Sequence, residues 1–412
     1  MTRTPVHPAV MRPATAPQLA AITPALCAIL FLALLLPGAG ARICAKGESL
    51  SPRKQGSVQS SRVREAASTV QQDAPFRIAV VGLAHGHVDG FFSQYRSRPD
   101  IQIVGIAESD ADVAARAAKR LRFDTALLYT SLDDMLVKAH PQAVVTYTST
   151  FEHRRVVETC ARHGVHVMME KPLAVSIADA HAIEKAAADG KIQVLVNFET
   201  TWYRSNRAAY EMAHDKGFGD IRKIVVHDGH SGPKEIGCGP DFLRWLTDPK
   251  LNGAGALFDF GCYGADLATW LLDGQRPTSV TAVTQQIKPD IYPNVDDEAT
   301  IVVAYPKTQV IIQASWNWPF DRKDMEIYGQ SGTLFVPRKD VIKLRTGTAP
   351  ESEKTPPPLP AAEADPLSYL AAVVRKEIKP SGLSSLEVNL TVTEILDAAR
   401  ESARTGKRVD LK

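Results

Sequence analysis

The chain contains 412 residues, of which 44% are hydrophobic and 23% are charged, and its formal net charge at pH 7 is +2. This length exceeds what one ordinary hydrophobic core accommodates, so two domains with appendages are expected. The composition is typical of a globular protein and excludes a chain that is disordered or membrane-embedded as a whole. The balanced charge, without a basic stripe interleaved with aromatic residues, argues against nucleic acid as a partner.

Residues 1–41 have the pattern of a targeting segment. Basic residues precede an apolar run at 26–36, and Ala39-Gly40-Ala41 provides the small residues that a signal peptidase requires. The apolar run is about half of the roughly 20 residues that a membrane-spanning helix needs. We therefore expect a signal peptide and export, to the periplasm or facing outward. An uncleaved anchor is the alternative, and it is the one membrane association expected. Residues 42–75, rich in Ser, Gln and Arg, are predicted to be a flexible linker.

The five cysteines show neither zinc-ligand spacing nor a C-x-x-C pattern, so we interpret them as isolated residues. One disulfide is the alternative in an exported protein. The cysteines are Cys27, Cys44, Cys160, Cys238 and Cys262.

Residues 76–197 alternate short apolar runs with helical patterns of 10–15 residues. Such an alternation is typical of a parallel sheet covered by helices on both faces, so we predict a doubly wound Rossmann domain. The expected strands are 77–81, 101–107, 143–147, 165–169 and 193–197, and the expected helices are 87–96, 111–122, 152–163 and 177–188.

Residues 198–412 change character, because several apolar runs follow one another through short turns. This pattern predicts an α+β domain with a large, mostly antiparallel sheet. The expected strands are 221–228, 279–286, 299–305, 309–316 and 325–328, and the expected helices are 205–216, 259–272, 366–377 and 386–403.

The first predicted strand ends in a loop that partly matches the dinucleotide fingerprint G-x-G-x-x-G/A. Gly82 supplies the tight turn, and Ala84 is nearly small enough for a pyrophosphate to approach. His87 departs from the pattern at the third position. The second strand ends in Glu108, 21 residues past His87, where an acidic residue accepts hydrogen bonds from a ribose 2′-hydroxyl. We therefore predict NAD as the cofactor, with NADP as the alternative, and we expect Asp110 to cap the next helix.

His85 and His87 raise the question of a metal site. Two histidines at i and i+2 in a turn, without a nearby carboxylate or third ligand in the sequence, seldom bind a metal. We predict no metal site and expect His85 to pack against the cofactor or the adjacent helix.

Several blocks of the sequence match a known pattern of threonine-proline, histidine, a glycine-histidine-valine strand and glutamate-lysine-proline. Thr148, His153, Gly164 and Glu170-Lys171-Pro172 fit the pattern, and Ser149 stands where proline is usual. In these blocks the chain resembles the Gfo/Idh/MocA oxidoreductase family. The glycine-rich block 253–263 and the tail 398–409 are similar to later parts of the family pattern, so the resemblance covers roughly 76–412.

The resemblance implies an NAD(P)-dependent oxidoreductase that acts on a hydroxyl of a sugar, polyol or glycoside. It implies that Lys171 lies in the active site, and that Thr148, His153 and Glu170 join Lys171 in binding the cofactor. Many relatives carry histidine at the position of Tyr263, four residues after Asp259.

Oxidation of an alcohol requires a hydride acceptor and a base for the hydroxyl proton. Asp259 and Tyr263 are expected to share one face of a helix, because they are four residues apart. A free tyrosine titrates near ~10, and we expect the Lys171 ammonium and an oxidised nicotinamide to lower the pKa of Tyr263. Tyr263 is then the proton acceptor, Lys171 its electrostatic partner, and Asp259 orients one of them or the sugar. Lys171 as the base is the alternative.

Aromatic and polar side chains that suit a sugar face and its hydroxyls follow the Rossmann segment. The candidates for substrate contact are Asn197, Trp202, Tyr203 and His230, with Trp316, Trp318, Arg322 and Lys323 as weaker candidates.

Two other functions remain open on the same scaffold. One is an NAD-dependent glycosidase that works by transient oxidation and elimination, and the other is a non-catalytic sugar or nucleotide sensor. Export favours a tightly retained cofactor, because free NAD is scarce outside the cytoplasm. The C-terminal sheet is expected to pair protomers in a homo-oligomer.

Overall fold

The computed structural model describes residues 74–411. The predictions for a signal peptide at 1–41 and for nearly all of the linker, together with Cys27 and Cys44, lie outside these residues. In the described part Cys160, Cys238 and Cys262 are free thiols. No helix there is long and apolar enough to cross a bilayer.

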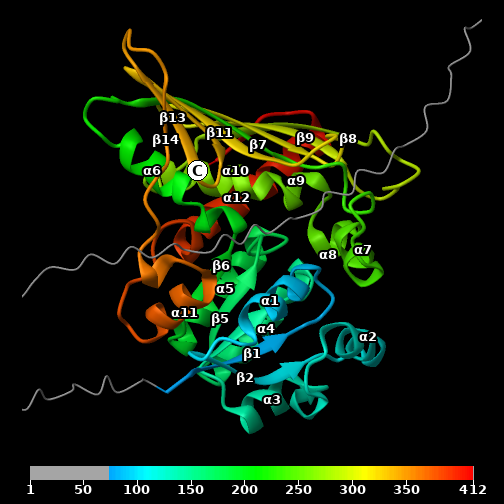
Figure 1. The fold of residues 1–412 in the computed structure, drawn as a ribbon. Coiled ribbons are helices and arrows are strands. Elements are labelled where there is room, and N and C mark those ends of the chain that lie inside the picture. The colour runs from blue at the N-terminus through cyan, green and yellow to red at the C-terminus, as the bar shows by residue number, and fades with distance from the viewer. Residues whose placement is uncertain (1–73, 412) are drawn as a thin grey trace, which may run out of the picture. The chain divides into compact units, whose positions relative to one another are not determined.

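Residues 76–197 form the predicted Rossmann domain (Figure 1). Its sheet has the order β3-β2-β1-β4-β5-β6, and its strand pairs are parallel. The order reverses between β1 and β4, which is the point where doubly wound sheets bind ligands at the carboxyl ends of their strands. The strands are β1 (Phe76–Val81), β2 (Ile101–Ala107), β3 (Leu128–Tyr129), β4 (Ala143–Thr146), β5 (His166–Glu170) and β6 (Val194–Asn197). The helices are α1 (His87–Tyr95), α2 (Ala111–Leu121), α3 (Leu132–Ala139), α4 (His153–Arg162) and α5 (Ile177–Gly190).

Two elements of this domain, β3 and α3, were not predicted. β3 is only two residues long, which is too short to show a hydrophobic period. α3 has eight residues and begins after Ser131, whose hydroxyl accepts the N–H of Asp134. The prediction that Asp110 caps the following helix is confirmed, because its side chain accepts the N–H groups of Asp112 and Val113.

The second half of the chain contains a nine-stranded sheet of order β14-β13-β12-β11-β7-β10-β9-β8-β15. β7 and β10 are parallel and the other neighbouring pairs of this order are antiparallel, so the prediction of a large, mostly antiparallel sheet is confirmed. The strands are β7 (Ile221–Gly229), β8 (Ser279–Gln285), β9 (Glu298–Ala304), β10 (Gln309–Ser315), β11 (Arg322–Gly329), β12 (Gly332–Arg338), β13 (Val341–Thr346), β14 (Ser352–Lys354) and β15 (Val409–Asp410). The last four were not among the predicted strands.

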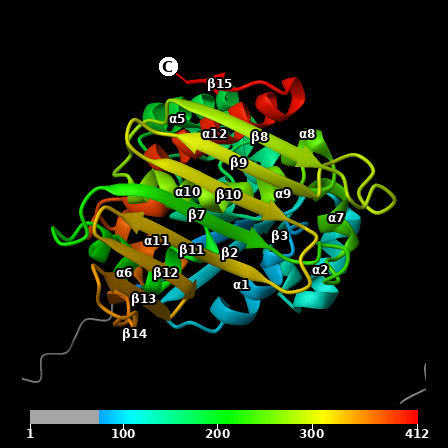
Figure 2. The same cartoon turned by 90° about the horizontal axis from the view of Figure 1, so that it is seen from above.

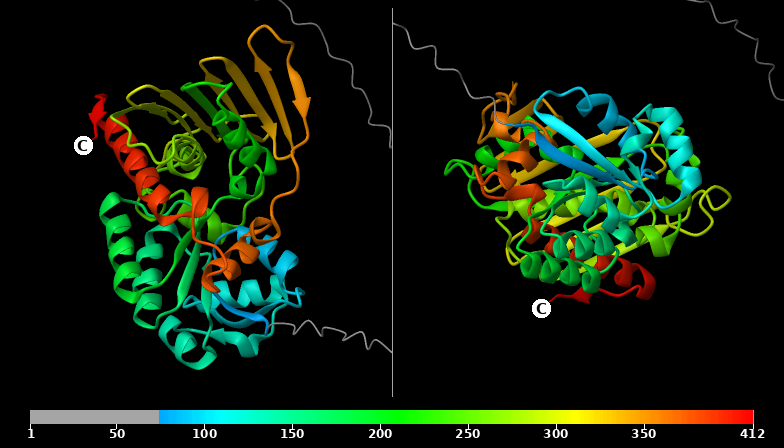
Figure 3. Two further views of the ribbon diagram at one scale, coloured as in Figure 1. Left: turned by 90° about the vertical axis from the view of Figure 1, so that its left-hand side faces the viewer. Right: turned by 90° about the horizontal axis from the view of Figure 1, so that it is seen from below.

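Helices fill the space between the two sheets and leave the other face of the large sheet uncovered (Figures 2 and 3). The buried helix α10 and the 20-residue helix α12 lie in this middle layer, and α12 begins at a Ser385 cap and ends at Gly406 in a left-handed conformation. The helices of this half are α6 (Arg204–Ala213), α7 (Pro240–Leu246), α8 (Pro249–Asn252), α9 (Ala256–Asp259), α10 (Gly261–Leu271), α11 (Pro366–Val374) and α12 (Leu386–Thr405).

Helix α11 returns to the Rossmann domain although it comes after the large sheet in the sequence. Leu367 and Leu370 are buried in one apolar cluster with Phe76 and Ile78 of β1. The N-cap Asp365 forms an ion pair with Arg98, which follows α1. The predicted division at residue 197 therefore does not separate the two cores completely, because α11 packs in the core that contains β1.

Candidate active site

Lys171 follows the carboxyl end of β5 and is held in a buried ion pair. Its Nζ atom donates to the Asp259 carboxylate at 2.5 Å and to the Asp259 carbonyl at 2.9 Å. The other carboxylate oxygen accepts the indole N–H of Trp316 at 3.0 Å. Burial by itself lowers the pKa of Lys171, but the Asp259 carboxylate outweighs burial and raises it, and the pKa of Asp259 is lowered in turn. The ion pair therefore favours the protonated form of Lys171.

Asp259 and Tyr263 do not share a helix, so that prediction was wrong. α9 ends at Asp259, α10 begins at Gly261, and Phe260 lies at the break. The N–H of Tyr263 bonds to the Phe260 carbonyl rather than to that of Asp259. The Asp259 carbonyl can therefore accept a hydrogen bond from Lys171. The break between α9 and α10 thus allows this contact.

Tyr263 is buried, and its ring lies near two ammonium groups. The Nζ atoms of Lys171 and Lys323 are 5.2 Å and 4.9 Å from the ring centroid. Burial, with a contribution from Glu199, raises the pKa of Tyr263 well above its ordinary value. The lowering of this pKa that we predicted for Lys171 and a bound nicotinamide is not found with Lys171 alone, because burial of Tyr263 has the larger effect.

The loop after β1 has the tight geometry that its glycine predicts. Gly82 has φ +80°, and a Cβ atom there would lie 2.6 Å from the Thr148 side chain. The Glu108 carboxylate accepts the N–H of Leu83 at 2.9 Å, and its other oxygen accepts the N–H of Asp110. Glu108 therefore lies directly against the predicted dinucleotide loop.

These residues fit a dinucleotide along the C-terminal edge of the sheet. α1 begins immediately after the loop, so its N-terminus faces the place of a diphosphate. Gly82 and Ala84 would allow the diphosphate to approach, and Glu108 would bind a ribose.

Thr148 and His153, which we predicted to bind the cofactor, are both buried. The Thr148 hydroxyl bonds to Thr146 and to the Ser149 carbonyl. His153 is 1% exposed and its Nδ1 lies 3.1 Å from the Pro172 carbonyl, while burial lowers its pKa to about 4. Their contacts position the loops that follow β4 and β5.

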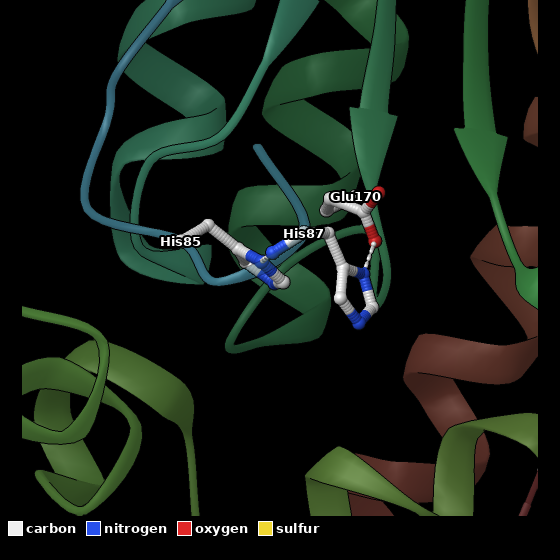
Figure 4. A group of neighbouring side chains, drawn as sticks. All are labelled: His85, His87 and Glu170. Atoms are coloured by element: carbon white, nitrogen blue, oxygen red, sulfur yellow. Dashed lines mark hydrogen bonds and ion pairs between the residues drawn. The ribbon is translucent and has the colours of Figure 1, made fainter. Parts of the chain in front are cut away.

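His85 and His87 meet Glu170 at the end of β5 (Figure 4). The Nδ1 atom of His87 lies 3.0 Å from one oxygen of Glu170, and the other oxygen accepts the side-chain amide of Asn197. Burial raises the pKa of Glu170, but His87 and Lys171 outweigh it, so the net pKa is lowered and the carboxylate is ionised. His87, the departure from the glycine fingerprint, thus connects the dinucleotide loop to β5.

The three side chains have ligand atoms within 4.8 Å of one another, which is the spacing of a metal-binding group. The sequence argument against a metal assumed that no carboxylate lies nearby, and that premise was wrong. The hydrogen bonds, however, favour a network without a metal. The Nδ1 atom of His85 accepts the backbone N–H of His87, which leaves the imidazole proton on Nε2 and removes that lone pair from a metal.

Helix α7, which was not predicted, covers the dinucleotide loop from the C-terminal half. The His85 ring packs against Phe242 and Trp245, at centroid distances of 4.6 and 5.4 Å. Asp241 of α7 forms an ion pair with Arg116 of α2 at 2.7 Å. These partners of His85 belong neither to a cofactor nor to the adjacent helix, the two predicted partners, but to a helix about 155 residues further along the chain.

The four predicted substrate residues lie in different surroundings. Asn197 bridges Glu170 and Trp202, because its carbonyl oxygen accepts the Trp202 indole N–H at 2.9 Å. The Tyr203 hydroxyl donates to Glu199, and the His230 ring packs edge-on against Phe260.

Trp202 lines a cavity of about 860 Å³ whose walls do not include Lys171 or Tyr263. Of the weaker candidates, Trp316 and Lys323 join the site, whereas Arg322 stacks on Trp318. Glu199 and Asp228 were not predicted as site residues, because neither belongs to a recognisable motif.

Comparison with protein families matches both halves of the chain. Residues 76–198 match the oxidoreductase family with an NAD-binding Rossmann fold, and residues 206–335 match the GFO/IDH/MocA C-terminal domain. The chain belongs to the Gfo/Idh/MocA oxidoreductase family. It is thus an NAD(P)-dependent oxidoreductase, and the resemblance seen in the sequence is confirmed.

Individual members of the family are distant in sequence. A trans-1,2-dihydrobenzene-1,2-diol dehydrogenase of Xenopus laevis is 26% identical over 313 residues, which cover 73% of this chain and 90% of the relative. A scyllo-inositol 2-dehydrogenase (NADP⁺) of Bacillus subtilis is 20% identical, with coverage of 79% and 96%. An inositol dehydrogenase homologue of Azotobacter vinelandii, solved with NAD⁺, shares the fold with a TM-score of 0.71 at 18% identity, covering 82% of this chain and 98% of that one.

The histidine–glutamate group generates a prediction about metal removal. Because its ring nitrogens are engaged in hydrogen bonds, dialysis against EDTA is expected to leave NAD affinity unchanged. Metal analysis of the dialysed and undialysed protein, with isothermal titration of NAD, checks this. About one equivalent of metal that disappears in His87→Ala would contradict the hydrogen-bonded interpretation.

Proposed function

We propose that this oxidoreductase oxidises a hydroxyl of a sugar, polyol or glycoside, with Tyr263 as the proton carrier and Lys171 as its electrostatic partner. One observation carries the proposal: a buried ammonium, fixed by Asp259, lies beside the Tyr263 ring at the carboxyl end of β5. When bound, the nicotinamide supplies the hydride acceptor. The named substrates of relatives, a diol and inositols, support the substrate class.

The chain's own residues divide the work as follows. Asp259 holds Lys171 protonated, so that Lys171 stabilises the negative charge that develops on the substrate oxygen. The Tyr263 oxygen accepts the hydroxyl proton. The Glu170 carboxylate, with His87 and Asn197, fixes the segment from which Lys171 projects.

The raised pKa of Tyr263 predicts how the rate depends on pH. Because the deprotonated form is scarce at neutral pH, kcat/KM for oxidation is expected to rise up to tenfold per pH unit between about 7 and 10. Tyr263→Phe is expected to lower kcat at least about 100-fold and to leave the Kd for NAD unchanged. Steady-state rates and NAD titration measure both, and undiminished turnover in Tyr263→Phe would refute the assignment.

The same protein preparation discriminates the alternatives. Nucleotide released on denaturation would support a retained cofactor. Release of phenol from aryl glycosides without net NADH would indicate the glycosidase, and NAD binding without turnover of any hydroxyl would indicate a sensor.

We propose NAD rather than NADP, because a carboxylate at the ribose position repels a 2′-phosphate. The Kd for NAD is expected to be at least about tenfold below that for NADP. Glu108→Gln removes the charge and keeps one of the two oxygens that accept backbone N–H groups. It is therefore expected to bring the Kd values for NAD and NADP closer together. Equal affinities in the native protein would count against this choice.

We further propose export through residues 1–41 and a homo-oligomer formed on the uncovered face of the large sheet. Exposed apolar side chains support the second proposal, since Val283 of β8 is 65% exposed. N-terminal sequencing of protein from the periplasm and light scattering of the purified protein test the two proposals. A start at residue 1, or a monomer at micromolar concentration, would oppose them.

A further inference from the structure

Asp228 is a buried carboxyl group without a hydrogen-bond partner. It lies near the end of β7 and is 1% exposed, and neither of its oxygens has a partner among the described residues. A buried polar group costs free energy unless it is hydrogen-bonded, so such a group calls for an explanation. The proposed mechanism does not use it.

The surroundings of Asp228 belong to the active site. Lys323 is its cross-strand neighbour on β11, and the Lys323 ammonium reaches both the Glu199 carboxylate and the Tyr263 ring. The Tyr203 hydroxyl donates to Glu199 at 2.5 Å. Asp228 therefore belongs to a cluster of polar side chains next to the Tyr263 ring. The ammonium group of Lys171 also lies near this ring.

A second buried carboxyl group without a hydrogen-bond partner, Asp266, serves as a comparison for Asp228. Asp266 of α10 is also fully buried with both oxygens unpaired, but burial alone accounts for its raised pKa. Asp228 instead feels the charges of four groups on three segments of the chain: Lys323 and Asp324 of β11, Glu199 after β6 and Lys171 after β5.

The protonation state of Asp228 decides what it can bind. Burial raises its pKa well above the ordinary value, and the nearby Lys323 offsets this only in part. A neutral carboxyl group has one O–H donor and a carbonyl acceptor, which together match a hydroxyl group, itself both donor and acceptor.

We propose that Asp228 binds a second hydroxyl of the substrate and thereby selects polyhydroxylated substrates over monohydric alcohols. This inference rests on the proposed function and specifies its substrate class. A site built to bond a hydroxyl strongly rejects an analogue that lacks it, because the buried protein group then stays unpaired.

Two substitutions of Asp228 distinguish the effect of its hydrogen bonds to the substrate from the effect of its size. Asp228→Asn keeps a donor and an acceptor, so kcat/KM for myo-inositol is expected to stay within about threefold of native. Asp228→Leu removes both and is expected to lower it at least about tenfold, mainly through KM. The rate with cyclohexanol, a ring with one hydroxyl, should change less than threefold, and the Kd for NAD should not change.

Stability tests whether Asp228 is a neutral, unpaired carboxyl group, and KM then distinguishes it from a structural residue of the same kind. A carboxyl whose folded pKa is raised loses stability as pH rises from about 4 towards that pKa. Asp228→Asn is therefore expected to have a higher Tm than native at pH 7, by about 2 °C or more, and the difference should vanish near pH 4. Asp266→Asn, the matched control, should show the same Tm behaviour with an unchanged KM.

Two results would overturn the inference. One is an unchanged KM for myo-inositol in Asp228→Leu, and the other is a native protein that turns over cyclohexanol as well as myo-inositol. The proposed function fails separately, when native protein neither binds NAD nor reduces it with any hydroxyl compound.

Discussion

The buried ion pair between Lys171 and Asp259 is the interaction on which the site depends. It joins the end of a Rossmann strand to a short helix of the C-terminal half, so it links the two halves at the proposed active site. Removing two charges from water costs several kcal/mol for each ion, and the mutual attraction repays this only when the remaining hydrogen-bonding groups are satisfied. Trp316 and the Asp259 carbonyl satisfy them here. The presence of the pair is therefore weak evidence that it stabilises the fold.

The local backbone around Asp259 explains how the pair is possible. Asp296 accepts the N–H groups of Gly255 and Leu257 at the start of α9, and a Cβ atom at Gly255 would lie 1.8 Å from the Asp296 carbonyl. Only glycine allows so close an approach. α9 then ends after four residues, and its last carbonyl turns to Lys171 rather than to the next helical turn.

Around this pair the polar groups divide into two networks. One extends through Glu170, His87 and Asn197 towards the dinucleotide loop. His87, which stands where the dinucleotide fingerprint has glycine or alanine, is part of this network. The other, with Asp228, Lys323 and Glu199, adjoins the Tyr263 ring from the side of the large sheet. In the proposed function the first network lies on the side of the cofactor and the second on the side of the substrate. At the dinucleotide loop, aromatic side chains of α7 pack against His85 and cover it.

The sequence by itself determined the two kinds of sheet, the family and the place of Lys171 after a parallel strand, because apolar periodicity, the glycine turn and Glu170-Lys171-Pro172 are local patterns. It also determined the Asp110 cap for the same reason. The tertiary structure alone decided the carboxylate beside His87, the broken helix at Phe260, the cover over His85 and the direction in which the pKa of Tyr263 shifts. Each of these depends on which groups meet across long separations in the chain, and both burial and charge compensation act through space rather than along the sequence.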